Sequence, residues 1–292
     1  MQRTILLAIA SALAAASADA ASFTASGDRW MYPFNGAAGL ETTASIFGAP
    51  GEPSFDDRDA QYLLDFATTA EIPAGQGASN YQITSARLTI TLKPEGEHGT
   101  WDYDPTYDPY TSYGAGTDSD AGRSIELYGV GYRNGFDTLS FTESSAFSPA
   151  GPPTPGVRNA YANDYAGGAD RDVSNNVRSG FDASPFAVGA IDGLAAGDAA
   201  PGGAEVVFEL ALSPDVVAYL QSRLDAGEVD LIVSGLFSAA FGGPATYPRF
   251  ETSEGAAAAV LDLEVQVVPE PGSALLLATG LATLVARRRS AG

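Results

Sequence analysis

One short acidic loop holds the side chains best suited to chemistry. Asp102, Asp104 and Asp108 present carboxylates at close spacing, and Asp118 and Asp120 follow further along the chain. Hard cations such as Ca²⁺ prefer oxygen ligands, and weak sites suffice outside a cell, where calcium is abundant. The loop lacks the Gly and the distal Glu of an EF-hand. The sequence therefore predicts a calcium site, with a solvated, turn-rich loop as the alternative.

Aromatic side chains share this loop with the carboxylates. Trp101, Tyr103 and Tyr107 are interleaved with the acidic positions. Exposed aromatic rings stack on sugars because both present flat apolar faces. The loop predicts either a glycan-stacking surface or, if the rings turn inward, packing of the loop onto the protein core.

Catalytic motifs are missing from the sequence. His98 is the single histidine, so multi-histidine metal sites are excluded and a Ser-His-Asp triad could use this residue alone. No G-x-S-x-G elbow, P-loop or dinucleotide fingerprint occurs. A two-carboxylate glycosidase needs a separation in space that spacing along the chain does not give. We therefore expect a protein that is not an enzyme, with His98 exposed in a polar loop.

Charge and composition restrict the partners. The chain has 15 basic and 36 acidic residues, and four of the former and two of the latter lie outside residues 21–268, which leaves a net charge near −23 for that segment. Nucleic acid is excluded as a partner because phosphate binding needs clustered cations. Divalent cations and neutral glycans are compatible with this charge. The absence of cysteine excludes disulfides, thiolate metal sites and iron–sulfur clusters.

Several segments alternate apolar and polar residues with the period of a half-buried strand. The alternation is clearest in residues 87–92, 205–212 and 261–267, and weaker candidates are residues 62–66, 125–130 and 231–237. Strands spread along the chain without a repeating helix favour antiparallel pairing. We predict an all-β fold, an antiparallel β-sandwich of jelly-roll type.

One short helix is predicted over residues 213–226. Ser213 can cap its start, Pro214 fits its first turn and Gly227 can end it. Its apolar stripe comprises Val216, Val217, Leu220 and Leu224.

The body of the protein is predicted to be one domain, residues 21–267. Long loops are expected near residues 95–123 and 148–203, which are rich in Gly, Pro, Asp and Asn. Function tends to concentrate on such loops.

Residues 1–20 have the features of a secretory signal peptide. Arg3 supplies the positive end, and an apolar stretch follows it. Ala18 and Ala20 place small residues at the two positions that guide cleavage, so we expect cleavage after Ala20. An uncleaved anchor helix is the alternative.

Residues 268–292 form a second signal. Val268, Pro269, Glu270 and Pro271 precede a hydrophobic helix expected at residues 272–286, and the basic cluster Arg287, Arg288 and Arg289 follows. A helix of that length extends about 22 Å, short of the roughly 30 Å hydrocarbon core of a bilayer. Spanning would require thinning of the bilayer and arginines that reach the cytoplasmic interface. An apolar helix packed on the soluble core is the alternative.

This tail resembles the PEP-CTERM protein-sorting signal. The resemblance implies transient anchoring in the inner membrane and cleavage by an exosortase-type protease at the Pro-Glu-Pro region. It also implies delivery of the body to the cell surface or the extracellular space.

Two parts of the body share a pattern with a known family. Residues 58–66 are followed at 83–90 by an I-x-S-A-x-L pattern, and residues 208–226 and 250–254 match its later part. The body thereby resembles DNRLRE-type jelly-roll modules, over both of its ends but not over the long insertions. The resemblance implies a surface or carbohydrate-associated role.

Together these features predict an exported, non-catalytic protein of the cell surface or extracellular matrix that associates with exopolysaccharide. The alternatives are a secreted carbohydrate-active enzyme and a calcium-stabilised structural matrix protein.

Overall fold

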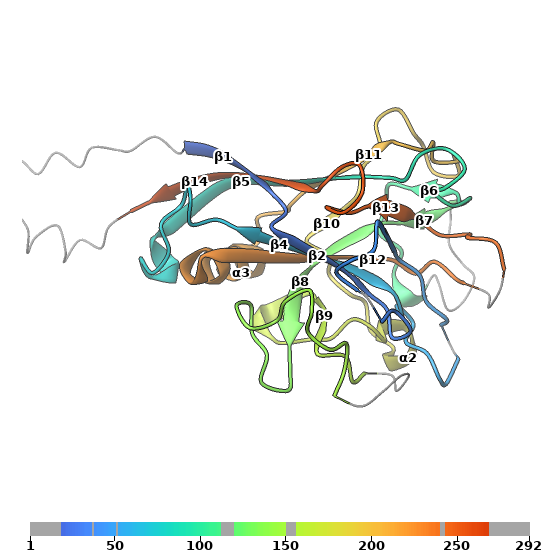
Figure 1. Ribbon diagram of the computed structural model, residues 1–292, viewed down its shortest axis with the longest axis horizontal. Coiled ribbons are helices and arrows are strands. Elements are labelled where there is room, and N and C mark those ends of the chain that lie inside the picture. The colour runs from blue at the N-terminus through green and yellow to red at the C-terminus, as the bar shows by residue number, and fades with distance from the viewer. Residues whose placement is uncertain are drawn as a thin grey trace, which may run out of the picture.

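Two antiparallel sheets face each other and form the two layers of the protein (Figure 1). The computed structural model describes residues 19–36, 38–50, 52–111, 120–149, 156–239 and 243–268. The first layer, sheet A, has the strand order β1-β14-β5-β11. Its strands are β1 (Asp19–Thr24), β14 (Val260–Val267), β5 (Tyr81–Thr91) and β11 (Glu205–Glu209).

The second layer, sheet B, has the order β10-β8-β12-β4-β2, and β9 also pairs with β8. Its strands are β10 (Ala187–Val188), β8 (Glu126–Tyr132), β12 (Glu228–Ser234), β4 (Gln61–Ala67), β2 (Gly27–Met31) and β9 (Ala160–Asn163). Two small pairs complete the strands: β3 (Thr43–Ser45) with β13 (Arg249–Glu251), and β6 (Tyr103–Asp104) with β7 (Arg123–Ser124).

The strand order is that of a jelly roll. When β2 and β9 are set aside, sheet A holds the first, eighth, third and sixth strands of the two sheets, and sheet B holds the second, seventh, fourth and fifth. Two interlocked Greek keys produce this interleaving. The predicted all-β class and antiparallel sandwich are confirmed.

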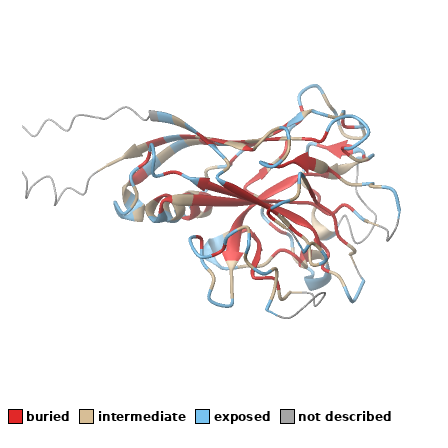
Figure 2. Ribbon diagram, viewed as in Figure 1, coloured by how far each residue is buried: buried red, intermediate tan, exposed pale blue. Residues whose placement is uncertain are grey.

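The main core fills the space between the sheets. Leu88 and Ile90 of β5 and Leu261 and Leu263 of β14 point inward from sheet A, as their period-two spacing predicts. Sheet B contributes its own alternate residues, among them Tyr62, Leu64, Phe66, Leu231 and Val233. Figure 2 shows the buried strands meeting in the middle of the molecule.

Helix α3 (Pro214–Ala226) closes one end of the sandwich, and its boundaries are those predicted. The Ser213 side chain accepts a hydrogen bond from the Val216 amide, and Gly227 ends the helix at a φ of 93°. Its buried residues are Val216, Tyr219, Leu220 and Leu224, whereas Val217 is only half-buried. Tyr219, which the predicted stripe did not include, is buried along with the other three predicted positions.

Residues 133–149 and 156–186 cover the outer face of sheet B and form a second core with it. Leu63, Tyr128 and Ile232 pack there against Phe141 and Val173. The prediction of an extended loop near residues 148–203 needs correction, because this stretch contains β9, β10 and two helical turns. The turns are η2 (Ala166–Gly168) and α2 (Asn176–Ser179), and a further turn, η1 (Ala78–Asn80), precedes β5.

Buried arginines hold this covering segment against sheet B. Arg158 is fully buried, bonds the Asp56 carboxylate and donates to the Arg58 carbonyl oxygen at 3.1 Å. Arg58 is also fully buried, and its guanidinium lies 2.8 Å from Glu126 of β8. Its Nε donates to Asn176 of α2 at 3.0 Å. Paired charges with several hydrogen bonds are the form in which ions are tolerated in a protein interior.

Truncation of Leu263 should destabilise the fold. Leu263 lies on β14, between β1 and β5, and is 1% exposed. We expect Leu263→Ala to lower the free energy of unfolding by about 2–5 kcal/mol, because it removes buried contacts and leaves a cavity. Urea unfolding of the purified exported protein measures this. The neighbouring exposed Glu264, changed to Ala, is the matched control and should alter stability by less than about 0.5 kcal/mol. Equal losses in both variants would contradict the assigned register.

Asp28 should make stability depend on pH. Burial raises the pKa of this carboxyl from 3.8 to about 6, against hydrogen bonds from Ser253 that lower it. The folded state therefore holds the proton more tightly than the unfolded chain, and this contribution is lost as pH rises from about 4 through 6. The free energy of unfolding should therefore decrease over this pH range, and Asp28→Asn should make that decrease smaller by up to roughly 3 kcal/mol. Urea unfolding at a series of pH values, with Asp262→Asn as the control, checks this. An unchanged slope in the Asp28 variant would count against it.

Candidate functional site

Both ends of the described chain leave the fold at one end of sheet A. β1 runs antiparallel to β14, with Asp19 opposite Val265 and Ala20 opposite Glu264. The amide of Val268 donates to the Asn80 carbonyl oxygen at 2.8 Å, directly after β14 ends. Figure 1 shows the two ends side by side. The expected signal cleavage after Ala20 falls within β1, so it would have to precede the closing of this strand pair.

Three of the five carboxylates predicted to bind calcium come together. Oxygen atoms of Asp104, Asp108 and Asp120 lie within 4.8 Å of one another. The parallel pairing of β6 with β7 brings the start and the end of the acidic loop to the same place. Asp102 is exposed and is not among these three carboxylates, so its part in a calcium site stays a prediction. Asp118 lies outside the described residues.

The cluster is already partly neutralised. An Nη atom of Arg123 lies 3.2 Å from the Asp108 carboxylate. Oδ1 of Asp104 accepts hydrogen bonds of 2.7 Å from the amide and the hydroxyl of Thr106, while Oδ2 of this fully buried residue has no partner among the described atoms. The arrangement offers oxygen ligands of the kind that Ca²⁺ prefers. Calcium binding at this loop stays a prediction.

The loop aromatics are packed into the protein. Trp101 is 6% exposed and makes an edge contact with Phe237, with ring centroids 5.4 Å apart. Tyr103 is 1% exposed, and its hydroxyl donates to the Gly189 carbonyl oxygen at 3.0 Å. Tyr107 is half-buried beside the second core. The glycan-stacking interpretation does not fit Trp101 and Tyr103, because their faces lie in the core, and the alternative of inward packing holds.

His98 is buried, which corrects the expectation of an exposed loop histidine. His98 is 8% exposed. Nδ1 lies 3.4 Å from the carbonyl oxygen of Pro94, and the His98 carbonyl oxygen accepts a hydrogen bond from the Arg249 amide. These contacts are with the backbone of neighbouring segments, so they give the residue a packing role.

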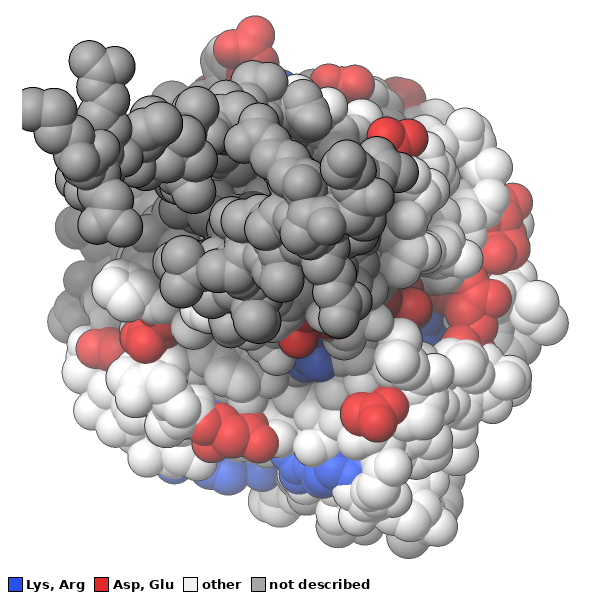
Figure 3. All heavy atoms as spheres, turned by 90° about the vertical axis from the view of Figure 1, so that its left-hand side faces the viewer, with Lys and Arg blue, Asp and Glu red and all other residues white. Residues whose placement is uncertain are grey.

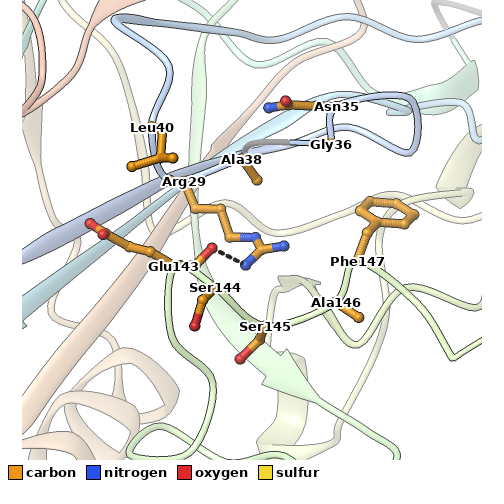
Figure 4. Close-up of a pocket in the computed structure, with 11 residues that line it drawn as sticks. Arg29, Asn35, Gly36, Ala38, Leu40, Glu143, Ser144, Ser145, Ala146 and Phe147 are labelled. Carbon is orange, nitrogen blue, oxygen red and sulfur yellow. Dashed lines mark hydrogen bonds between the residues drawn. The ribbon is translucent and has the colours of Figure 1, made fainter.

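An open cavity of about 510 Å³ lies between the loops at residues 35–40 and 143–147. Arg29 lies between them, with Phe147 at one end and Leu40 at the other (Figure 4). Nη1 of Arg29 donates to the carbonyl oxygens of Thr142 at 2.9 Å and Glu143 at 2.6 Å. Burial lowers the pKa of Arg29 to about 10, so this guanidinium stays charged at neutral pH.

The cavity combines the groups that small polar ligands need. Ser144, Ser145, Phe147 and the exposed Leu40 all line the cavity, and both serine hydroxyls lie within hydrogen-bond distance of the Thr142 hydroxyl. Ligand pockets commonly have volumes of about 300–1,000 Å³ and mix apolar walls with a few polar groups. Sequence reasoning missed this site, because about a hundred positions separate Arg29 from Glu143 and neither stands in a recognisable motif.

Acidic side chains are scattered over the visible surface at the end from which the described chain termini leave. Figure 3 shows them scattered over this face, with basic side chains gathered near its lower edge. The overall formal charge of −21 agrees with this picture.

Comparison with known protein families identifies the C-terminal segment. Residues 267–289 match the PEP-CTERM protein-sorting motif. The chain carries a PEP-CTERM sorting signal. It is therefore an exported protein that is anchored transiently in a membrane and processed by exosortase, a membrane protease. No curated protein sequence matches the chain at a significant level.

Much of both signals lies outside the described residues. For the expected signal peptide this applies to Ala18. For the sorting signal it applies to Pro269, Glu270 and Pro271, the hydrophobic segment 272–286, and Arg287, Arg288 and Arg289. Within the part of the chain that the structure describes, no helix is long and apolar enough to cross a membrane. The signal peptide and the DNRLRE-like character of the body stay predictions.

Proposed function

We propose that the body is a non-catalytic protein that exosortase processing delivers to the cell surface or to an extracellular polysaccharide matrix. The sorting motif, which begins at the last residue of β14, is the observation that supports this most directly. Strand pairing protects the chain up to Val267, and the Pro-Glu-Pro segment follows it. Cleavage there would release the whole sandwich without removing a strand.

The cavity around Arg29 supports an association with polysaccharide. The Glu143 carboxylate and the half-buried ring of Phe147 offer a hydrogen-bond acceptor and an apolar surface to a sugar. The excess of acidic residues repels polyanions in general. The proposed ligand is therefore a neutral glycan.

A carbohydrate-active enzyme is the competing function. A screen of the purified exported protein against a panel of polysaccharides separates the two, because turnover would yield shorter products whereas a binding protein gives saturable binding alone. Detection of products would overturn the non-catalytic proposal.

Loss of the sorting motif should block processing. Replacement of Pro269, Glu270 and Pro271 by Ala should leave the protein unprocessed and retained with the membrane, because the protease would lack its recognition segment. Cell fractionation and immunoblotting measure size and location. Glu264→Ala, an exposed change on β14, is the control and should be processed normally. Normal processing of the triple variant would overturn the proposed sorting route.

Removal of the Phe147 ring should weaken glycan binding. We expect Phe147→Ala to raise the Kd for a bound neutral polysaccharide about tenfold, equal to about 1.4 kcal/mol, through loss of ring stacking. Affinity electrophoresis with soluble polysaccharides measures this. Leu139→Ala is the control, because Leu139 is 63% exposed and does not line the cavity. Equal affinity of the two variants would remove the cavity from the proposal.

A further inference from the structure

Three carboxylates gather on the outer face of sheet B, beside the end of α3. The strand register places Asp65 of β4 opposite Asp230 of β12. Glu228 lies two residues before Asp230, so both point to the same face of the sheet. One oxygen from each of the three residues lies within 4.8 Å of the other two. The adjacent strands are visible in Figure 1.

Two of these carboxylates are buried and incompletely bonded. Asp65 is 8% exposed and Asp230 is 0% exposed. Oδ1 of each has no hydrogen-bond partner among the described atoms. Oδ2 of Asp230 accepts a hydrogen bond of 2.6 Å from the Tyr132 hydroxyl, which fixes the orientation of that carboxylate. A buried anionic oxygen without a partner is costly, so these atoms point to a ligand that the cluster can bind.

The neighbouring arginines balance this negative charge only in part. Nε of Arg223 lies 4.0 Å from Asp230, and its other nitrogens bond the Thr138 hydroxyl and the Val130 carbonyl oxygen. Arg29 also acts on Asp65, but its guanidinium is bonded to backbone carbonyls of the covering segment. Asp28 and Glu143 add further negative charge near Asp65. Burial and these neighbours raise the pKa of Asp65 well above its usual value, and burial raises that of Asp230 to about 7.

We propose that Asp65, Glu228 and Asp230 bind a divalent cation, with calcium as the ion that fits best. The donor set is made of oxygen atoms, which favours hard cations over zinc or copper. Calcium accepts six to eight ligands in irregular geometry and can complete its shell with water, whereas magnesium requires a near-ideal octahedron. Glu228 is half-buried and gives the ion a route from solvent.

A bound cation would tie β4 to β12 and would neutralise both buried carboxylates. The inference rests on the exported location, because calcium is abundant outside the cell. Calcium binding would make the folded protein more stable outside the cell than in a calcium-poor environment. The cluster is distinct from the acidic loop, whose carboxylates come from β6 and the residues around it.

The melting temperature of the purified exported protein tests the site. With calcium at about a hundredfold above its Kd, we expect a rise of roughly 5–10 °C over the protein in chelator. Asp65→Asn and Asp230→Asn should lose most of this rise. Asp65→Asn should also melt no lower than the wild type in chelator, because it relieves the repulsion between Asp65 and the neighbouring carboxylates. This second result separates loss of a ligand from general damage to the fold.

Asp104→Asn in the acidic loop is the matched control and should keep most of the calcium response. The proposal is overturned if calcium leaves the wild-type melting temperature unchanged, or if the Asp65 and Asp230 variants respond to calcium as the wild type does. A response lost in Asp104→Asn but kept in Asp65→Asn would also overturn it and would assign the ion to the loop. Sorting is measured separately by fractionation, so failure of one proposal does not imply failure of the other.

Discussion

Burial of sheet B on both faces is the constraint on which the rest of the structure depends. One face packs against sheet A and α3, and the other packs beneath residues 133–149 and 156–186. Each central strand therefore contributes side chains to both cores. In β4, Tyr62 and Leu64 lie in the main core and Leu63 lies in the second core. A sheet covered in this way has no solvated face, so every polar side chain on it must find its partner inside the protein.

That requirement explains the unusual number of buried charges near sheet B. Arg58 pairs with Glu126 of β8, and Arg158 of the covering segment pairs with Asp56. These ion pairs neutralise the buried carboxylates and also hold the covering segment in place. Asp65 and Asp230 face the same interior without an equivalent arginine between them. Breaking a buried pair is costlier than the pair is stabilising, which makes such positions sensitive to substitution.

Sheet A has a different task, which is to bring the two ends of the chain together. β14 lies between β1 and β5, so the strand that leads into the sorting motif is among the best protected of its sheet. The sorting motif begins at the end of this strand, so all the described strands come before the Pro-Glu-Pro segment. The cavity near Arg29 is lined by loops beside β2, the edge strand of sheet B.

The sequence by itself determined the sorting signal, the all-β class, the main strands and helix α3, because each depends on local chemistry: a contiguous motif, a period of two, or a cap at each helix end. Tertiary structure alone decided which side chains meet. Asp104 joins Asp108 and Asp120 while Asp102 is exposed, Trp101 is buried, and Asp65 faces Asp230 from a strand that is remote in sequence. Strand β9 escaped prediction because its short segment is buried by contact with β8 rather than marked by its own alternation. Pairing between distant strands sets these distances, and no spacing along the chain encodes them.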